Sequence, residues 1–407
     1  MPVCGYSQNR YIGHQLIRFN VSTDTQLKTL RSTVSWGYDI WTHSGITRGF
    51  IDVRVPANQV STVATLAIPF EILVANIQGV VDKEHRHMRR YSIPLANQVN
   101  SKNPNISFAS IFDDWQSYET LSAYISSLPG VTQLPSIGKT FLGQDTNAFM
   151  FGSGQYNVVM QGGIHAREWI SHSTVTYVAN QLATNHPNLL QQFTFYVIPV
   201  VNPDGYNYTR SPNGDRYHRK NMQPNNGTNC IGTDVNRNFN INWSGPGASS
   251  NPCDDDYYGT FPFSTPEAKN IRCWHSYSEL FMFSNAYSCA TQVKDFSTLN
   301  HAAQLAVEAI QKTHGHVFSY GAACPTIYEA SGIASDYTYN ILNITYSYSV
   351  ELRPNSSDPA GFNPSTDNIV DSGEEITAAM VALWTYVGIQ LSKSSNETYR
   401  SLLKKRR

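Results

Sequence analysis

The stretch NVVMQGGIHAREW, residues 157–169, joins an apolar run to two titratable side chains. Its first six residues are typical of a short strand, and residues 171–183 are typical of a buried helix. The continuous apolar run at 193–201 indicates a central strand. Helical spacing of apolar residues recurs at 300–313 and 374–391. This alternation predicts an α/β fold in which helices cover both faces of a sheet.

The first 85 or so residues follow a different pattern. Residues 14–21 alternate like a half-buried strand, and Thr23 or Asp24 can cap the helix that follows. Further strands and a second helix complete the order β-α-β-β-α-β, which predicts a small α+β open sandwich. We expect four segments along the chain: a small domain at 10–85, a linker at 86–107, a large domain at 108–393 and a solvated basic tail at 394–407.

The segment between Asp82 and Ser107 is first basic and then rich in Asn, Ser and Pro, with no sustained period. This composition favours an exposed linker. Arg86, Arg89 and Arg90 in such a linker would be open to a trypsin-like protease. The alternative is a solvated charged turn with no role in processing.

Composition excludes several classes of protein. The chain has 407 residues, 29 basic and 30 acidic, and this near-neutral balance argues against nucleic acid as the main partner. Its 41% hydrophobic and 12% aromatic content argues against disorder. It contains no apolar run of about 18 residues that would predict a membrane helix. The first ten residues lack the apolar core of a signal peptide, yet several Asn-x-Ser/Thr triplets favour an extracellular protein.

Residues with metal-binding chemistry directly follow the strand at 157–162. His165 and Glu168 are three residues apart, so on a tight turn both side chains can face one point. An imidazole and a carboxylate suit Zn²⁺. Alone, this pattern is weak, and a surface His beside an N-capping Glu explains it equally well. Later segments supply what a complete site would need: Arg219, Asn236-Arg237, His275-Ser276-Tyr277-Ser278, Tyr328 and Glu351.

In their order and spacing, these segments resemble the zinc metallocarboxypeptidases of the carboxypeptidase A/B type, over almost the whole chain. The first domain resembles the activation peptide of that family, including Ile51-Asp52-Val53-Arg54-Val55-Pro56. The resemblance implies a mixed central sheet and one zinc ion. It also implies hydrolysis of the C-terminal peptide bond of peptides or proteins by a monomeric, secreted proenzyme that a trypsin-like protease activates. Deacylation of small N-acyl amino acids is a more distant alternative.

The resemblance also implies a role for each matching residue. The expected zinc ligands are His165, Glu168 and His275, the general base is Glu351, and the residue that stabilises the oxyanion is Arg219. The expected substrate contacts are Asn236, Arg237, Tyr328, Arg167, Tyr277 and Phe362. The implied disulfides are Cys230–Cys253 and Cys289–Cys324, which leaves Cys4 and Cys273 without a family partner.

Elementary chemistry agrees with these roles. Two neutral imidazoles and one carboxylate leave zinc a net positive charge and an open position for an acidic water. Glu351 can accept the proton of that water and deliver it to the leaving amine. Arg237 can hold a carboxylate through two parallel hydrogen bonds, a geometry that selects a free C-terminus.

The chain departs from the family just before His275. The segment STPEAKNIRCW, residues 264–274, supplies a helix, but a central strand of about five or six residues is missing. One hypothesis is that the deletion leaves a gap in the sheet, displaces His275 and creates a pseudo-enzyme that binds C-termini without hydrolysis. The other is that residues 271–274 are drawn into the strand. A ring nitrogen of His275 within about 3–4 Å of the His165/Glu168 pair would favour an intact site.

The preferred C-terminal residue depends on the floor of the specificity pocket. Counting seven residues past Tyr328 gives Ser335, where A-type enzymes have an apolar residue and B-type enzymes an Asp. An uncharged floor cannot offset a buried Lys or Arg charge. We therefore expect neutral, apolar or aromatic C-terminal residues, with Ile333 narrowing the pocket.

Overall fold

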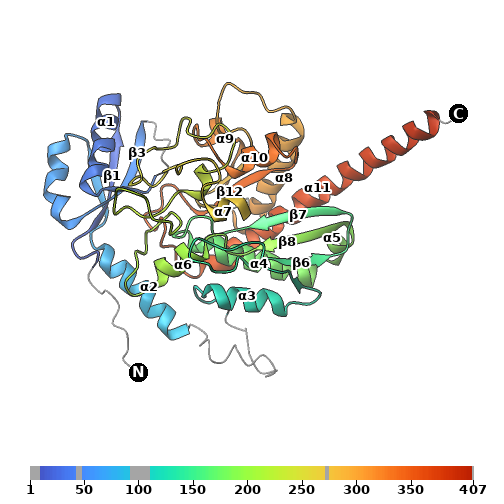
Figure 1. Cartoon of the computed structure of the whole chain (residues 1–407), viewed down its shortest axis with the longest axis horizontal. Coiled ribbons are helices and arrows are strands. Elements are labelled where there is room, and N and C mark those ends of the chain that lie inside the picture. The colour runs from blue at the N-terminus through green and yellow to red at the C-terminus, as the bar shows by residue number, and fades with distance from the viewer. Residues whose placement is uncertain (1–9, 43–47, 92–110, 271–274, 406–407) are drawn as a thin grey trace.

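The computed structural model describes residues 10–42, 48–91, 111–270 and 275–405 and shows a small N-terminal unit against a larger one (Figure 1). Cys4, Cys273, the segment 271–274 and most of the expected linker lie outside the described residues. Among the described helices, none is both long and apolar enough to cross a bilayer.

The small unit has the expected order of elements. Strands β1 (Gln15–Val21), β2 (Asp39–Ile40), β3 (Gly49–Val55) and β4 (Phe70–Val74) form an antiparallel sheet in the order β2-β3-β1-β4. Helix α1 (Asp24–Ser32) and the 3₁₀ segments Thr33–Trp36 and Ala57–Leu66 complete the unit. Thr23 caps α1 through a reciprocal contact with Gln26, as capping chemistry predicts. Inward-facing residues such as Phe19, Leu30 and Val53 fill the core.

The expected linker begins inside a helix, so the prediction of irregular structure from residue 82 onward is wrong for 82–91. Helix α2 runs from Ile77 to Tyr91. Its buried Ile77, Val81 and Met88 are four and seven residues apart and form one helical face. Because these few apolar residues are separated by charged ones, the helical pattern is difficult to recognise in the sequence.

The large unit is an α/β fold with mixed strand directions, as predicted. One sheet has the order β5 (Thr132–Gln133), β6 (Phe149–Gly152), β8 (Phe193–Ile198), β7 (Tyr156–Gln161). The other has the order β11 (Ser319–Ala322), β10 (Leu280–Phe283), β12 (Tyr348–Asn355), β9 (His275–Ser278). Strands β7 and β8 are parallel, as are β9 and β12, whereas β10 and β12 are antiparallel.

Helices pack around these sheets and enclose the main core. They are α3 (Tyr118–Ser127), α4 (Trp169–Asn185), α5 (Pro187–Gln192), α6 (Pro203–Arg210), α7 (Pro266–Asn270), α8 (Phe296–His314), α9 (Ala323–Thr326), α10 (Ala334–Asn340) and α11 (Asn368–Lys405). Helix α11 continues through most of the expected tail and extends away from the body of the molecule (Figure 1). The expected tail is thus helical over 394–405, because no Gly or Pro after Gly388 interrupts the helix.

The described strands of the large unit form two separate sheets, and residues 271–274, on which the two hypotheses differ, lie outside the described residues. Among the described strands, none joins β7 to β12 or to β9. A cavity of about 800 Å³ lies there, lined by residues 157–161 of β7 and by Tyr348 and Val350 of β12.

Candidate functional site

A tight glycine turn carries the chain from β7 to the first candidate ligand. Gly163 has φ +66°, and a Cβ there would lie 2.4 Å from the ring of His172, so no other residue fits without strain. The Gly163 N–H donates to Ser171 Oγ at 2.8 Å, which ties the turn to α4. As a result, His165 and Glu168 face the same point at the start of α4, as their spacing predicts.

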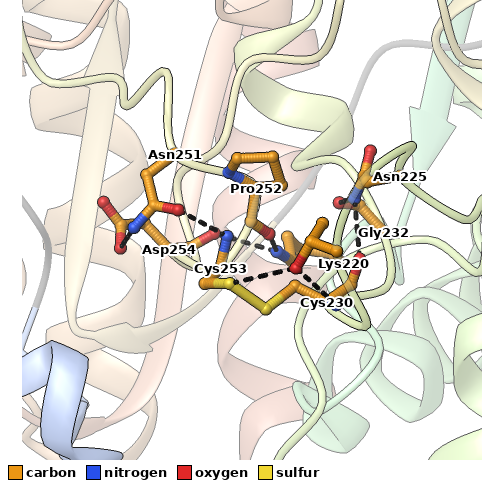
Figure 2. The surroundings of a disulfide bond; sticks show 9 residues. Lys220, Asn225, Cys230, Gly232, Asn251, Pro252, Cys253 and Asp254 are labelled. Carbon is orange, nitrogen blue, oxygen red and sulfur yellow. Dashed lines mark hydrogen bonds between the residues drawn. A yellow bond between two sulfur atoms is a disulfide. The ribbon is translucent and has the colours of Figure 1, made fainter.

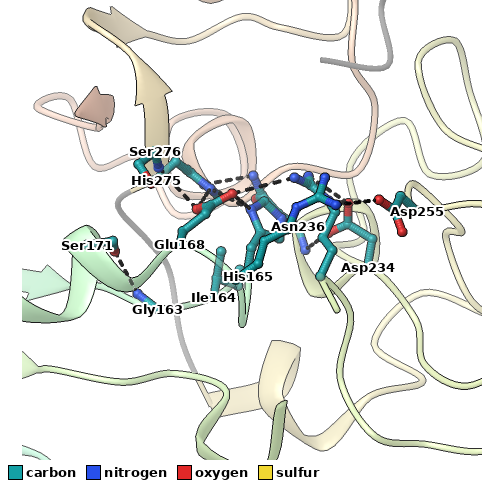
Figure 3. Close-up of polar contacts among 12 residues, drawn as sticks. Gly163, Ile164, His165, Glu168, Ser171, Asp234, Asn236, Asp255, His275 and Ser276 are labelled. Carbon is teal, nitrogen blue, oxygen red and sulfur yellow. Dashed lines mark hydrogen bonds and ion pairs between the residues drawn. The ribbon is translucent and has the colours of Figure 1, made fainter. Parts of the chain in front are cut away.

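The three expected zinc ligands converge in the structure (Figure 3). Nδ1 of His165 lies 2.7 Å from Oε1 of Glu168 and 3.1 Å from Nδ1 of His275. Nδ1 of His275 lies 3.7 Å from Oε2 of Glu168. Two ligands about 2.1 Å from one ion at tetrahedral angles are about 3.4 Å apart, so this buried N,N,O set fits Zn²⁺.

Strand pairing holds His275 in place despite the missing residues. Strand β9 retains His275–Ser278, which pair in parallel with β12 so that His275 lies opposite Glu351. The Ser276 N–H donates to Oε2 of Glu168 at 3.1 Å, and Nε2 of His275 lies 2.9 Å from the side-chain amide of Asn236. The third ligand therefore reaches the other two, and the expected displacement is not observed.

Asp234 is a functional candidate that the sequence analysis missed. Its Oδ1 lies 3.1 Å from Nε2 of His165, and its Oδ2 accepts hydrogen bonds from Arg219 Nε and Nη2 at 3.1 and 3.0 Å. Asp234 thus orients the ring of a candidate metal ligand and the cation expected to stabilise the oxyanion. Its proximity to Asn236-Arg237 in the sequence was the available signal.

Opposing charges set the protonation of the buried carboxyls. Burial favours the neutral form of Glu168, but the His165 and His275 rings outweigh it and lower its pKa well below the ordinary value. Burial and the nearby Glu168 raise the pKa of Glu351 well above its ordinary value, while Arg219 and Arg237 oppose this. Glu351 therefore has the higher proton affinity of the two glutamates, which suits a proton acceptor.

The expected substrate-binding cations lie on the same side of the site. Arg219 is 3.5 Å from Glu168, and Arg237 is almost fully buried. Arg237 Nη2 donates to the Tyr328 hydroxyl at 3.0 Å, so these two candidate contacts for a C-terminal carboxylate meet. The backbone N–H of Ala334 donates to Asn236 Oδ1 at 3.0 Å, which places the start of α10 beside them.

A disulfide anchors the loop that carries these groups (Figure 2). Cys230 and Cys253 are bonded on either side of the Asn236-Arg237 segment, and a second disulfide joins Cys289 to Cys324, both as expected. Lys220 Nζ donates to the carbonyls of Pro252 and Asp254, which links the disulfide to the segment that carries Arg219.

The expected pocket floor is Ser335, and it is almost fully buried at the start of α10. Ile333 packs nearby in an apolar cluster with Met282, Ala286, Ala323 and Ala330. Among the described residues of this cluster, none is charged. The serine side chain adds no charge, and the carboxylate of the adjacent buried Asp336 accepts hydrogen bonds from the backbone N–H groups of Ala286 and Tyr287.

The small unit covers the remaining expected contacts. Arg167 Nη1 lies 3.3 Å from Oδ1 of Asp39, and its guanidinium lies 4.1 Å from the centre of the Phe362 ring. Trp41 packs against Phe362 with ring centres 5.3 Å apart, and Tyr277 packs on the same ring. Asp39 and Trp41 were not singled out from the sequence, because only docking of the two units brings them to the site.

One buried ion pair and two hydrogen bonds from Arg18 also attach the small unit to the large one. Arg216 Nε donates to Glu84 of α2 at 2.6 Å, and Arg18 pairs with Asp52 while donating to the carbonyls of Ser356 and Ser357. These contacts across the two units hold the small unit over the large one.

Comparison with known proteins agrees with this geometry. Residues 117–379 match the family described as zinc carboxypeptidase, and residues 17–84 match the carboxypeptidase activation peptide. Carboxypeptidase A2 of Mus musculus is 30% identical over 410 residues, which cover 94% of this chain and 95% of that relative. Carboxypeptidase A1 of Mus musculus is also 30% identical and covers 93% of this chain and 94% of that relative.

Two solved structures have a similar fold. The crystal structure of thrombin activatable fibrinolysis inhibitor has a TM-score of 0.78 and 28% identity, over 92% of this chain and 99% of that one. The carboxypeptidase A from Helicoverpa armigera has a TM-score of 0.80 and 24% identity, over 93% of this chain and 98% of that one.

Proposed function

Because this chain belongs to the zinc carboxypeptidase family and carries that family's activation peptide, we propose that it removes neutral, apolar or aromatic residues from peptide C-termini. The observation that carries this proposal is the convergence of His165, Glu168 and His275 beside Glu351. It is a zinc enzyme made as a proenzyme. The preference for a neutral, apolar or aromatic C-terminal residue is a more specific claim than carboxypeptidase activity itself.

The residues divide the chemistry between them. When bound by the three ligands, zinc supplies a Lewis acid and lowers the pKa of a coordinated water. Glu351 would serve as the general base that takes a proton from the attacking water and returns it to the leaving amine. Arg219, oriented by Asp234, faces the oxygen that becomes negatively charged. Arg237, with Asn236 and Tyr328, holds the terminal carboxylate and so limits the reaction to the last peptide bond.

The uncharged Ser335 supports the specificity. A Lys or Arg side chain near Ser335 would lose its hydration, and the adjacent Asp336 is a poor partner because backbone N–H groups hold its carboxylate and burial raises its pKa to about 7. That loss is costly, because an unpaired buried charge is strongly disfavoured. An aromatic or aliphatic side chain has no charged group, so it loses no comparable hydration when it enters the pocket.

Contacts of the small unit support inhibition before cleavage. Asp39 pairs with Arg167, which Asp255 of the large unit also binds, and Trp41 packs on the aromatic cluster of Tyr277 and Phe362. A peptide substrate would need these same side chains. We propose that a trypsin-like protease cuts within 86–107 and that the protein acts outside the cell, where its two disulfides are stable.

A pseudo-enzyme is the alternative, because no described strand joins β9 (His275–Ser278) to β7. Such a protein would keep Asn236, Arg237 and Tyr328 and bind C-termini without cleaving them.

One experiment separates the two functions. Purified full-length protein is treated with trypsin, its zinc content is measured, and hydrolysis of N-blocked dipeptides ending in Phe or Lys is followed. The proposal expects about one zinc per chain and cleavage of the Phe substrate only, and only after trypsin. Zinc without any turnover would favour the pseudo-enzyme, and faster cleavage of the Lys substrate would overturn the specificity.

A further inference from the structure

The carbonyl of Glu168 is held differently from the carbonyls at other helix starts. In α1, α3, α6, α8 and α10 the carbonyl of the residue before the helix accepts a bond from the backbone N–H four residues later, as in ordinary helices. Before α4, the Glu168 carbonyl accepts from the backbone N–H of Ser171, three residues later, and from Nδ1 of the His172 ring, both at 3.0 Å. The side chain of His172 thus takes the place that its backbone N–H would ordinarily have.

This contact determines which ring nitrogen of His172 carries the proton. A carbonyl oxygen can only accept a hydrogen bond, so Nδ1 must be the donor. Nε2 has no hydrogen-bond partner among the described residues, and the side chain is fully buried. The ring is therefore an uncharged imidazole that directs its one N–H at the backbone of a candidate metal ligand.

Packing prevents the His172 ring from turning. One face stacks on Tyr206, with ring centres 4.0 Å apart and planes at 19°, and Tyr206 is itself held by the bond that its hydroxyl donates to the Gln116 carbonyl. The Cδ2–Nε2 edge lies against Gly163, where a Cβ would be 2.4 and 2.5 Å from these two atoms. His172 therefore contacts both ends of the turn from Gly163 to Glu168 that carries the first two candidate ligands.

The backbone of Glu168 has a conformation that needs such support. Its φ of −87° and ψ of 63° are those of the central residue of an inverse γ-turn, which the Trp169 N–H closes by donating to the Arg167 carbonyl at 3.1 Å. The angle ψ sets the direction of the Glu168 carbonyl, and φ and ψ together set the direction of its side chain. A donor that holds the carbonyl therefore also restricts where the carboxylate points.

We propose that His172 is a positioning residue of the zinc site. Its Nδ1–H holds the Glu168 carbonyl and thereby keeps the Glu168 carboxylate at the distance from His165 that one ion requires. The inference rests on zinc binding at the proposed site, but not on turnover.

The test compares two variants of nearly the same shape. His172→Asn keeps an N–H donor near the position of Nδ1, whereas His172→Leu has none, and both lose the stacking on Tyr206. Zinc dissociation constants of the full-length, uncut proteins are measured by competition with a chromogenic chelator. His172→Leu should bind zinc roughly 10- to 100-fold more weakly than the wild type, and His172→Asn within about threefold of it. His186→Leu, at the other end of α4, is the control and should leave the zinc affinity unchanged.

Unfolding temperatures separate this role from simple packing. A buried Leu costs less than a buried Asn, so the metal-free His172→Leu protein should be the more stable of the two although it binds zinc more weakly. The visible absorption bands of the Co²⁺-loaded protein should shift in His172→Leu and stay in place in His172→Asn. Zinc affinities in the same order as the unfolding temperatures, or equal affinities, would overturn the proposal.

If either variant does not fold, the wild type still decides. Nitrogen-15 NMR of the protein with labelled histidines should show His172 with its proton on Nδ1, and a proton on Nε2 would overturn the proposal. A wild type that binds no zinc would instead overturn the proposed function together with this role, and that result is obtained before any variant is compared.

Discussion

Glu351 of β12 lies directly opposite His275 of β9 in a parallel pair of strands. The backbone pairing of β9 with β12 therefore positions both the candidate base and the third candidate metal ligand. This explains how His275 keeps its place despite the shorter segment before it, because His275 and Ser276 pair with β12 at Glu351 and Leu352.

Glu351→Gln should keep zinc and lose catalysis. Gln has nearly the same shape but cannot accept a proton, so kcat should fall by roughly 10²–10⁴-fold. Zinc content and kcat of the trypsin-treated protein are the measurements. The exposed Glu329, adjacent to Tyr328, provides the control, and Glu329→Gln should behave like the wild type. Loss of zinc in Glu351→Gln would mean that this carboxylate is structural.

Arg237→Lys should impair recognition of the terminal carboxylate. A single ammonium cannot reproduce two parallel hydrogen bonds, and we expect kcat/KM for a C-terminal Phe substrate to fall roughly 10- to 100-fold. The amidated substrate, which the wild type should cleave poorly, should show little further loss. Because Arg237 also donates to Gly247 and Asn236, the unfolding temperature must be compared as well. An equal loss on both substrates would contradict the assigned role.

Asp39→Asn should loosen the cover over the site. It weakens the ion pairs of Asp39 with Arg167 and Arg54, so the uncut proenzyme should hydrolyse the Phe dipeptide several-fold faster than the wild type. After trypsin treatment the two proteins should be equal. Asp24→Asn is the control, because the Asp24–Arg48 pair is exposed on the same unit and should not affect activity. No change in the uncut Asp39→Asn protein would show that this contact does not inhibit.

His14 should make the small unit sensitive to acid. Burial and the Arg54 cation, with a smaller contribution from Arg10, lower the pKa of His14 to about 4 from 6.5, while Asp215 opposes the shift. Below pH 6.5 the unfolded chain therefore binds a proton that the folded chain does not, and stability falls as the pH decreases towards 4. Because His14 is partly exposed, the loss should be roughly 1 kcal/mol or less per pH unit.

The measurement is the denaturant midpoint at pH 7 and at pH 5, for the wild type and for His14→Gln. Gln can still face Arg54 but cannot take the proton, so its midpoint should drop less between the two values. An identical drop in both proteins would assign the acid sensitivity to other groups.

Short-range pattern was sufficient for much of this protein. The spacing of His165 and Glu168 after a Gly-Gly turn predicted two ligands facing one point, and apolar periods located most strands and the helices around them. The ligand spacing and the apolar periodicity each depend only on residues close together in the chain, so both can be read from the sequence. The pattern was less informative where few apolar residues define a face, and the last part of α2 was therefore read as a linker.

Contacts between residues far apart in the sequence could be identified only from the tertiary structure. The position of His275 depends on a ladder with β12, the role of Asp234 on its bonds to His165 and Arg219, and the covering by Asp39 and Trp41 on docking of two units. Each of these arrangements depends on hydrogen bonds, burial and charge interactions between residues that are far apart in the chain. A short stretch of sequence does not contain both partners of such an interaction, so it cannot predict the arrangement.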